Sequence, residues 1–180
     1  IAVAGQYAYV AEDTALEVVN VNNPAFPQSV GPFASIPGLH VAVDGTKLYT
    51  VNGSLHVADL SDPASPAPGN SVALPAKAPS ISVAGAGATH RLYIADNTSG
   101  LLIYGLSDPS APNQLGTYAA SSVHDVAVSG NYAYVANDAD VRIVDVSNPA
   151  APSLTGSYTH AHLHYAEAIS ASGSSVLVGD

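Results

Sequence analysis

Cysteine, methionine and tryptophan are all absent from this chain of 180 residues. Without cysteine, neither a disulfide framework nor a thiolate metal site can form, and the redox compartment is not revealed. Lysine and arginine are scarce as well: four basic residues stand against fourteen acidic ones, and the formal net charge is -10. Because such a chain repels phosphate backbones, we expect no nucleic-acid partner.

Two further absences bear on location. No apolar run reaches the length of about 18 residues that a spanning helix needs, so we expect no direct insertion into a membrane. The chain contains no Met and its first residue already lies in an apolar strand pattern. We therefore expect an internal segment of a longer chain, and export stays open.

The common catalytic signatures are missing too. The chain has no GxSxG elbow, no phosphate loop and no dinucleotide fingerprint, since its Gly residues follow strands into hairpins and not into helices. No helical periodicity extends over about 10 residues or more. These absences favour a binding or structural role over catalysis.

What the chain does contain is an internal repeat. Short apolar segments ending in Gly recur about every 40 to 45 residues. They are IAVAG (1–5), VAVDG (41–45), ISVAG (81–85), VAVSG (126–130) and ISASG (169–173). A second marker, [ND]PxxP, recurs out of phase as NPAFP (23–27), DPASP (62–66), DPSAP (108–112) and NPAAP (148–152). Asn or Asp followed by Pro is β-turn chemistry, so each of these markers ends a strand.

Between the markers, each unit carries a Tyr-rich segment and an apolar segment, such as NYAYVAN (131–137) and VRIVDVS (141–147). Together with an innermost and an outer segment, each unit contains four short strands, the size of a β-propeller blade. We therefore predict an all-β fold, a β-propeller of four-stranded antiparallel blades with four complete repeats and part of a fifth, belonging to a larger ring. Residues 1–180 would form one partial propeller, with blades at about 1–40, 41–80, 81–125 and 126–168 and the start of a fifth at 169–180.

The unit HDVAVSGNYAYVANDADVRIVDVSNPAAPSLTGSY (124–158) resembles the LVIVD repeat, which is named for the apolar strand that appears here as VRIVDVSNP. The resemblance covers nearly the whole chain. Residues 81–125 diverge most, because of an insertion around GAGATHR. The resemblance implies a β-propeller of bacterial or archaeal surface or secreted proteins, so we expect an extracellular or cell-surface location. It implies no known reaction.

In a propeller, the residues that enter each innermost strand border the central channel, where side chains from different blades converge. The ionisable and polar residues at these positions are His40, Ser80, His124, Asp125 and Glu167. They are candidates for a ligand-binding mouth, because imidazole and carboxylate groups hold metals and polar ligands. The alternative is structural: Asp125 and its equivalents would bond backbone amides of the loops.

A second candidate is the stretch YTHAHLHYAEA (158–168), which places His160, His162 and His164 at every second position. In an extended chain these side chains point the same way, roughly 6.5–7 Å apart. Two neighbours can then share one Zn²⁺ or Cu²⁺ with a third ligand such as Glu167, whereas all three cannot reach one ion. The alternative is the polar face of an exposed outer strand or loop.

Two hypotheses for the function follow. The first is a non-catalytic surface or secreted scaffold that binds a protein, a glycan or copies of itself. The second is a metal-binding protein or metalloenzyme with His ligands near the channel and Zn or Cu as the metal. The lack of a catalytic motif favours the first, and no cofactor is required by it.

Overall fold

In the computed structural model, all residues are described except 139, 160–164 and 180. The chain divides into two compact units. The first comprises Ile1–Leu74 with Pro109–Ala111, and the second comprises Pro75–Asp108 with Pro112–Asp180.

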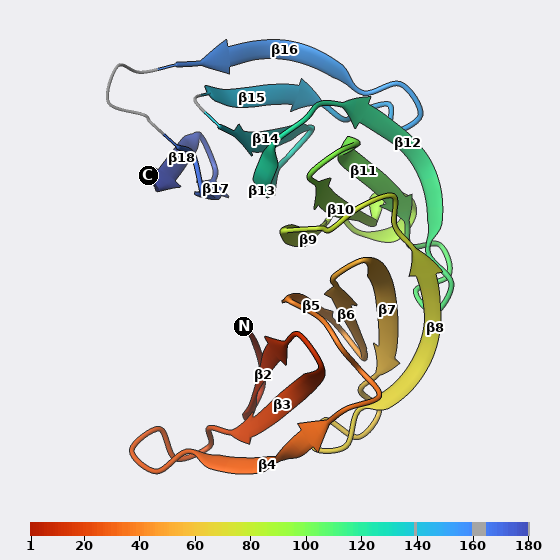
Figure 1. The fold of residues 1–180 in the computed structure, drawn as a ribbon, viewed down its shortest axis with the longest axis vertical. Helices are drawn as coiled ribbons and strands as arrows, with labels where there is room; N and C mark the ends of the chain where they lie inside the picture. The colour runs from red at the N-terminus through yellow and green to blue at the C-terminus, as the bar shows by residue number, and fades with distance from the viewer. Residues whose placement is uncertain (139, 160–164, 180) are drawn as a thin grey trace. The chain divides into compact units, whose positions relative to one another are not determined.

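The first unit contains two antiparallel sheets of four strands each, in which neighbours in sequence are neighbours in the sheet (Figure 1). The first sheet is formed by β1 (Ala2–Ala4), β2 (Tyr7–Glu12), β3 (Ala15–Asn20) and β4 (Gln28–Phe33). The second is formed by β5 (His40–Asp44), β6 (Lys47–Val51), β7 (Ser54–Asp59) and β8 (Ala67–Ala73). Each sheet corresponds to one predicted repeat.

The second unit contains two further sheets of the same kind and a two-stranded sheet. The third sheet is β9 (Ser80–Ala84), β10 (Arg91–Asp96), β11 (Gly100–Gly105) and β12 (Asn113–Ala119). The fourth is β13 (Val123–Ser129), β14 (Tyr132–Asn137), β15 (Asp140–Asp145) and β16 (Ser153–Tyr158), and the last pair is β17 (Ala168–Ser172) and β18 (Ser175–Gly179). The prediction of four-stranded antiparallel sheets followed by the start of a fifth is confirmed.

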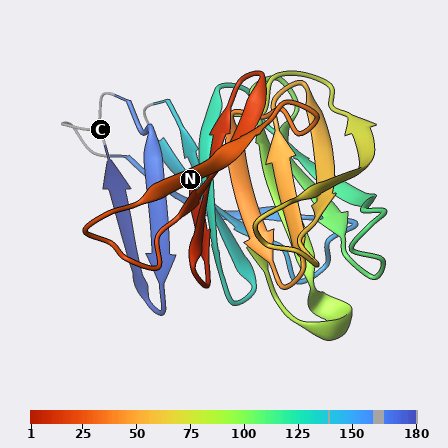
Figure 2. The same ribbon diagram turned by 90° about the horizontal axis from the view of Figure 1, so that it is seen from below.

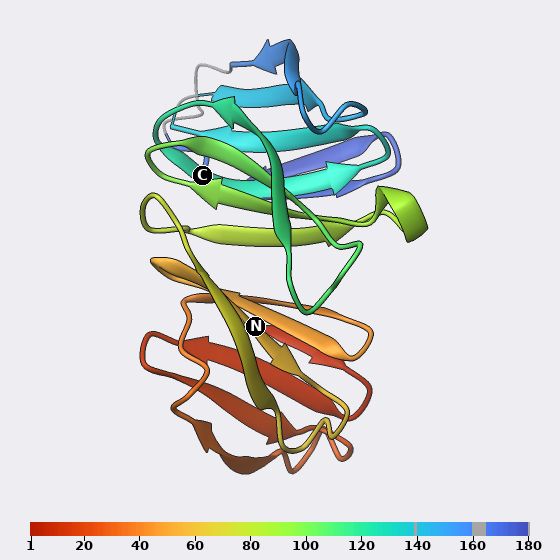
Figure 3. The ribbon, with the colours of Figure 1, turned by 90° about the vertical axis from the view of Figure 1, so that its right-hand side faces the viewer.

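The described residues contain one short 3-10 helix, η1 (Gly87–Thr89), which lies in the insertion of the third repeat. It projects beyond the ends of the neighbouring strands, as Figure 2 and Figure 3 both show. Among these residues, no helix has the length and apolar character that crossing a membrane would require.

Successive sheets within a unit pack face to face through apolar side chains. In the first unit, Tyr9, Leu16 and Val18 share a core with Val41 and Leu48. In the second unit, the corresponding core joins residues of the third and fourth sheets: Tyr93, Leu101 and Ile103 with Val135, Val144 and Val146. This repeated packing explains why the innermost strands are apolar without a charged alternate face.

The Tyr-rich strands and the [ND]PxxP turns contact each other within the first unit. The hydroxyl of Tyr9 donates to the carbonyl of Pro63 at 2.9 Å, and the hydroxyl of Tyr49 donates to the carbonyl of Pro109 at 3.0 Å. Both tyrosines are completely buried. The Tyr strand of one repeat is therefore bonded to the [ND]PxxP turn of the next.

Candidate functional site

The residues predicted at the strand entrances lie partly inside the strands. β13 begins at Val123, so His124 and Asp125 belong to it, and the register with β14 shifts between Val123 and Asp125. This irregularity at the end of the ladder turns the Asp125 side chain toward the neighbouring innermost strands. Ser80 is the first residue of β9.

Asp125 connects three innermost strands of the second unit. Its Oδ1 accepts hydrogen bonds from the hydroxyl of Ser80 and from the amide of Val126. Its Oδ2 accepts the amide of Ile169 at 2.7 Å, so the carboxylate reaches β9 on one side and β17 on the other. These are the bonds that the structural interpretation of Asp125 expects. Ligand binding by Ser80 and Asp125 stays a prediction.

His124 forms a second cluster with residues that are remote in sequence. Its Nε2 lies 2.9 Å from Oδ1 of Asp138, and its ring centroid lies 5.0 Å from that of Tyr165. The hydrogen bond with His124 is the main cause that holds the pKa of Asp138 below its ordinary value, and hydroxyls of Ser122 and Tyr165 contribute. The sequence interpretation missed Asp138 and Tyr165, because each looked like an ordinary turn or loop residue.

The backbone around this cluster is strained. Ser122 has φ 56° and Asp138 has φ 38°, and these are the positive-φ residues other than Gly in the described part of the chain. Such conformations are held in place only by surrounding contacts, and they gather at functional sites. The Asp138 carbonyl accepts the amide of Ala166 at 2.6 Å, so the cluster also holds the segment that enters β17.

A His bonded to a carboxylate has an oriented ring and a second nitrogen that can bind a proton, a metal or a ligand acceptor. No group of three His, Asp or Glu side chains suited to a metal ion occurs among the residues described here. His160, His162 and His164 lie outside the described residues. The proposed use of Zn or Cu in that stretch therefore stays a prediction.

The remaining candidates do not join these clusters in the described structure. His40 is the first residue of β5 in the first unit and is exposed. Glu167 is exposed as well, and its amide donates to the carbonyl of Gly179 at 3.0 Å. Both stay predictions as ligands.

An apolar groove beside the last two strands was not predicted from the sequence. It has a volume of about 320 Å³. Its lining residues come from β14, β15, β16 and β18: Tyr134, Val141, Ile143, Tyr158, Val176 and Val178.

Comparison with known proteins identifies the repeat. The model of the LVIVD repeat matches residues 1–34, 39–73, 76–120 and 120–160. The chain belongs to the LVIVD repeat family. The resemblance seen in the sequence is thus confirmed, across four repeats. No curated protein matches this LVIVD chain.

Solved structures support the propeller fold. A functionally unknown protein from Desulfotomaculum acetoxidans is similar with a TM-score of 0.69 at 15% identity, over 90% of this chain and 56% of its own. A periplasmic gluconolactonase from Pseudomonas aeruginosa is similar with a TM-score of 0.71 at 13% identity, over 86% of this chain and 51% of its own. The chain spans about half the length of these structures. At such identities the likeness shows the fold alone.

Proposed function

We propose that this LVIVD chain is a non-catalytic binding scaffold that takes up an extended apolar strand at its two-stranded sheet. The observation that carries the proposal is a difference between equivalent surfaces of two successive blades. On the third blade this surface is covered, and on the fourth it forms the groove.

The repeat alignment makes the comparison residue by residue. Ile103 of the third blade corresponds to Ile143 of the fourth. Ile103 is 0% exposed and lies in the core that includes Val144 of β15 and Val146, which follows that strand. Ile143 is only partly buried and lines the groove. Among the described strands, none covers the groove as β15 covers the third blade.

The outer wall of the groove shows the same difference. Tyr118 of the third blade is partly buried and packs against that core, whereas its counterpart Tyr158 is 55% exposed. Exposed apolar side chains that gather around a groove mark a site of interaction. Their chemistry suits aliphatic side chains and offers no charge for a sugar or an ion.

The free edge of β18 determines the binding mode. β10 and β14 pair with a strand on both sides, whereas β18 pairs with β17 alone among the described strands. An extended segment added to this edge would gain backbone hydrogen bonds, and its alternate side chains would enter the groove. A partner with Val at alternate positions, like Val144 and Val146, fits this surface. The third strand of an LVIVD blade is such a segment.

The proposal is tested with a peptide of residues 140–146, DVRIVDV, added to the purified chain and followed by amide NMR. We expect saturable shifts at β18 and around the groove. A peptide in which the positions of Val144 and Val146 carry Asn should not bind. Replacement Tyr158→Ser should weaken binding about tenfold, which corresponds to about 1.4 kcal/mol, a reasonable loss for a buried aromatic contact.

Tyr132→Ser is the matched control, because Tyr132 is an exposed tyrosine of the same blade that does not line the groove. Equal binding of the two peptides, or equal loss in the two variants, would contradict the proposal.

We also propose an extracellular or cell-surface location. The support is the family resemblance, together with an acidic composition that suits an exposed scaffold. An antibody against the chain should label intact cells of the source organism. Labelling only after lysis would contradict this location.

A further inference from the structure

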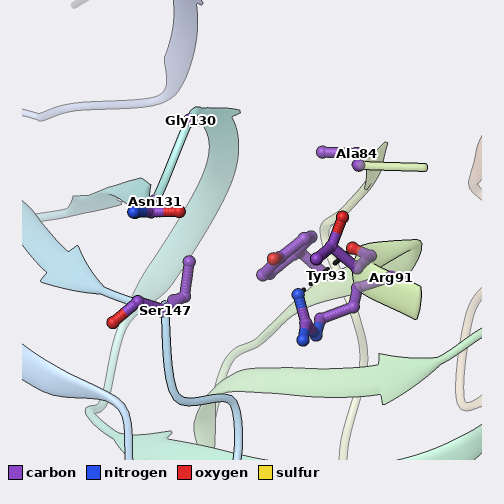
Figure 4. Close-up of a pocket in the computed structure, with 9 residues that line it drawn as sticks. Ala84, Arg91, Tyr93, Gly130, Asn131 and Ser147 are labelled. Carbon is purple, nitrogen blue, oxygen red and sulfur yellow. Dashed lines mark hydrogen bonds between the residues drawn. The ribbon is translucent and has the colours of Figure 1, made fainter. Parts of the chain in front are cut away.

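A pocket of about 340 Å³ lies at the ends of the third and fourth sheets, away from Ser80 and Asp125. It is bordered by the β9–β10 connection, the β13–β14 turn and the end of β15. Figure 4 shows Arg91 and Tyr93 on one side, with Asn131 and Ser147 across from them. All of these residues belong to the second unit.

The insertion of the third repeat builds one wall of this pocket. Between β13 and β14 the turn consists of Gly130 and Asn131, whereas Gly85 and five further residues (86–90) connect β9 to β10. Gly85 has φ +89°, and a Cβ placed there would meet the carbonyl oxygen of Thr89 at 2.1 Å. The inserted loop therefore folds tightly back on itself and brings Thr89 to the pocket.

Arg91 is the charged side chain among the residues that line the pocket. Its Nη1 donates to the carbonyl of Thr89 at 3.1 Å, while its Nε is buried and has no hydrogen-bond partner. Within the described part of the chain, no carboxylate forms an ion pair with it. The guanidinium thus has no carboxylate partner among the described residues, although a chain of net charge -10 has many carboxylates that could have supplied one.

Comparison between repeats shows that the third blade lacks the carboxylate that pairs with a basic side chain in the second blade. In the second blade, Lys47 stands directly opposite Asp59 across the strand pair, and Nζ lies 2.6 Å from Oδ2. In the third blade, Arg91 occupies the place of Lys47, and the residue opposite is Gly105. The Asp that the second and fourth blades have at this position is thus replaced by Gly in the third, where a basic side chain lines a pocket.

We propose that this pocket binds a small organic molecule through its carboxylate, with the Arg91 guanidinium as the counter-charge. A carboxylate takes the place that Asp59 has in the second blade, and the planar guanidinium matches its two oxygens. The side chain of Asn131 provides a neutral hydrogen-bonding group on the opposite wall (Figure 4). Val146 and the ring of Tyr93 supply apolar contact for the remainder of the ligand.

Asp145, the last residue of β15, is already hydrogen-bonded. Asp145 accepts the amide of Ser147 at 2.8 Å and also its hydroxyl, and it does not line the pocket. The local field in the pocket is therefore set by Arg91. The volume admits one small ligand and excludes polymers.

The test uses benzoate and its neutral analogue benzamide, titrated into the purified chain at constant ionic strength and followed by amide NMR. We expect saturable binding of benzoate at the pocket, and at least about tenfold weaker binding of benzamide, since only benzoate supplies the charge. Arg91→Gln should reduce benzoate binding at least tenfold. Arg142→Gln should leave it unchanged, because Arg142 is paired with Asp140 outside the pocket.

A second pair of variants tests the counter-charge directly and leaves Arg91 in place. Gly105→Asp restores the Asp of the repeat opposite Arg91 and should abolish benzoate binding. Gly105→Ala adds the same Cβ without charge and should retain it. The Cβ would meet Asn113 Oδ1 and a Leu115 methyl at 3.2 Å, contacts that flexible side chains can relieve.

The inference is overturned if benzamide binds as tightly as benzoate, if Gly105→Asp binds like Gly105→Ala, or if the folded native chain shows no saturable benzoate shifts. Binding of inorganic phosphate without binding of benzoate would also overturn the assignment to a carboxylate. The spectrum of each variant reports its folding. The Gly105 pair decides the matter if Arg91→Gln fails to fold.

Discussion

A single carboxylate, that of Asp125, joins three innermost strands. It accepts hydrogen bonds from backbone amides of β13 and β17 and from a side-chain hydroxyl of β9. These three strands belong to different sheets and form no backbone ladder with one another. A side chain therefore provides the polar contact from one sheet to the next. Asp is suited to this because its two oxygens accept several bonds at once.

Replacement Asp125→Ala should destabilise the second unit by about 2 kcal/mol, because the amide of Ile169 loses its acceptor in a partly buried setting. Urea unfolding measures the loss, and hydrogen exchange should show a faster rate at Ile169 in particular. Asp13→Ala is the control, since Asp13 is exposed in the β2–β3 turn. Unchanged protection of the Ile169 amide would show that the bond contributes nothing.

At the level of strands, the outer strands of the third and fourth blades each contain a Gly at an equivalent position, and the two have different surroundings. In β12, a Cβ at Gly116 would meet the carbonyl oxygen of Pro149 at 2.1 Å. The equivalent Gly156 of β16 has nothing within 4 Å of such a Cβ. β12 therefore passes close to the Pro turn of the following repeat, which contains Pro149.

Gly116→Ala should cost about 1–3 kcal/mol, because backbone must shift to admit the methyl group. Gly156→Ala should change stability by less than about 0.5 kcal/mol, since its methyl enters open space. Thermal unfolding of the two variants compares the same chemical change at equivalent positions. Equal effects would mean that the close approach at Pro149 is not maintained in solution.

For the whole molecule, the pH of the solution affects stability through the carboxylates that accept hydrogen bonds in the folded state. The pKa of Asp59 is held below its ordinary value mainly by the hydrogen bond from Lys47, and that of Asp145 mainly by the bond from Ser147. A carboxyl group whose pKa is lowered by folding stabilises the folded state at pH values above its pKa in the unfolded chain, which is about 4. This contribution is lost as the pH falls toward the lower pKa of the folded state.

We therefore expect the melting temperature to fall between about pH 5 and pH 2. Asp59→Asn should flatten this decline slightly, because the group is exposed and screened by solvent. Lys47→Gln should flatten the same part of the curve, since it removes the other partner of the pair. Circular dichroism melts at fixed ionic strength provide the measurement, and a decline unaltered by either variant would contradict the assignment.

The repeats, the strands and the family could be predicted from the sequence because their signals are local. Alternating β-branched residues, Gly hairpins and Asn-Pro or Asp-Pro turns each determine the conformation of a few neighbouring residues. The bonding of Asp125 to Ile169 could not be predicted in detail, since the two residues are 44 positions apart. The contact of Asp138 with His124 could not be predicted either, because a tight hairpin turn explains the NDAD segment (137–140) by itself.

The groove and the pocket were missed for a different reason. The pocket arises where one repeat departs from another, because Gly105 stands in place of an Asp, and the groove is lined by residues that are distant in the sequence. A search for repeated patterns finds the positions that the repeats share and does not find the positions at which one repeat differs. Aligning the repeats against each other and asking which contacts lose a partner would have led to Arg91 and Ile143.

The bond from a Tyr hydroxyl to the Pro carbonyl of the next repeat has a consequence for how such a chain can be rebuilt. The donor of Tyr9 and its acceptor on Pro63 lie on either side of a repeat boundary, so no repeat is self-sufficient. Inserting or deleting one whole period in the first unit would leave each such hydroxyl opposite an equivalent carbonyl. A protein engineer can thus lengthen or shorten this array in period-sized steps, whereas a fragment of a period leaves a buried phenol without its acceptor.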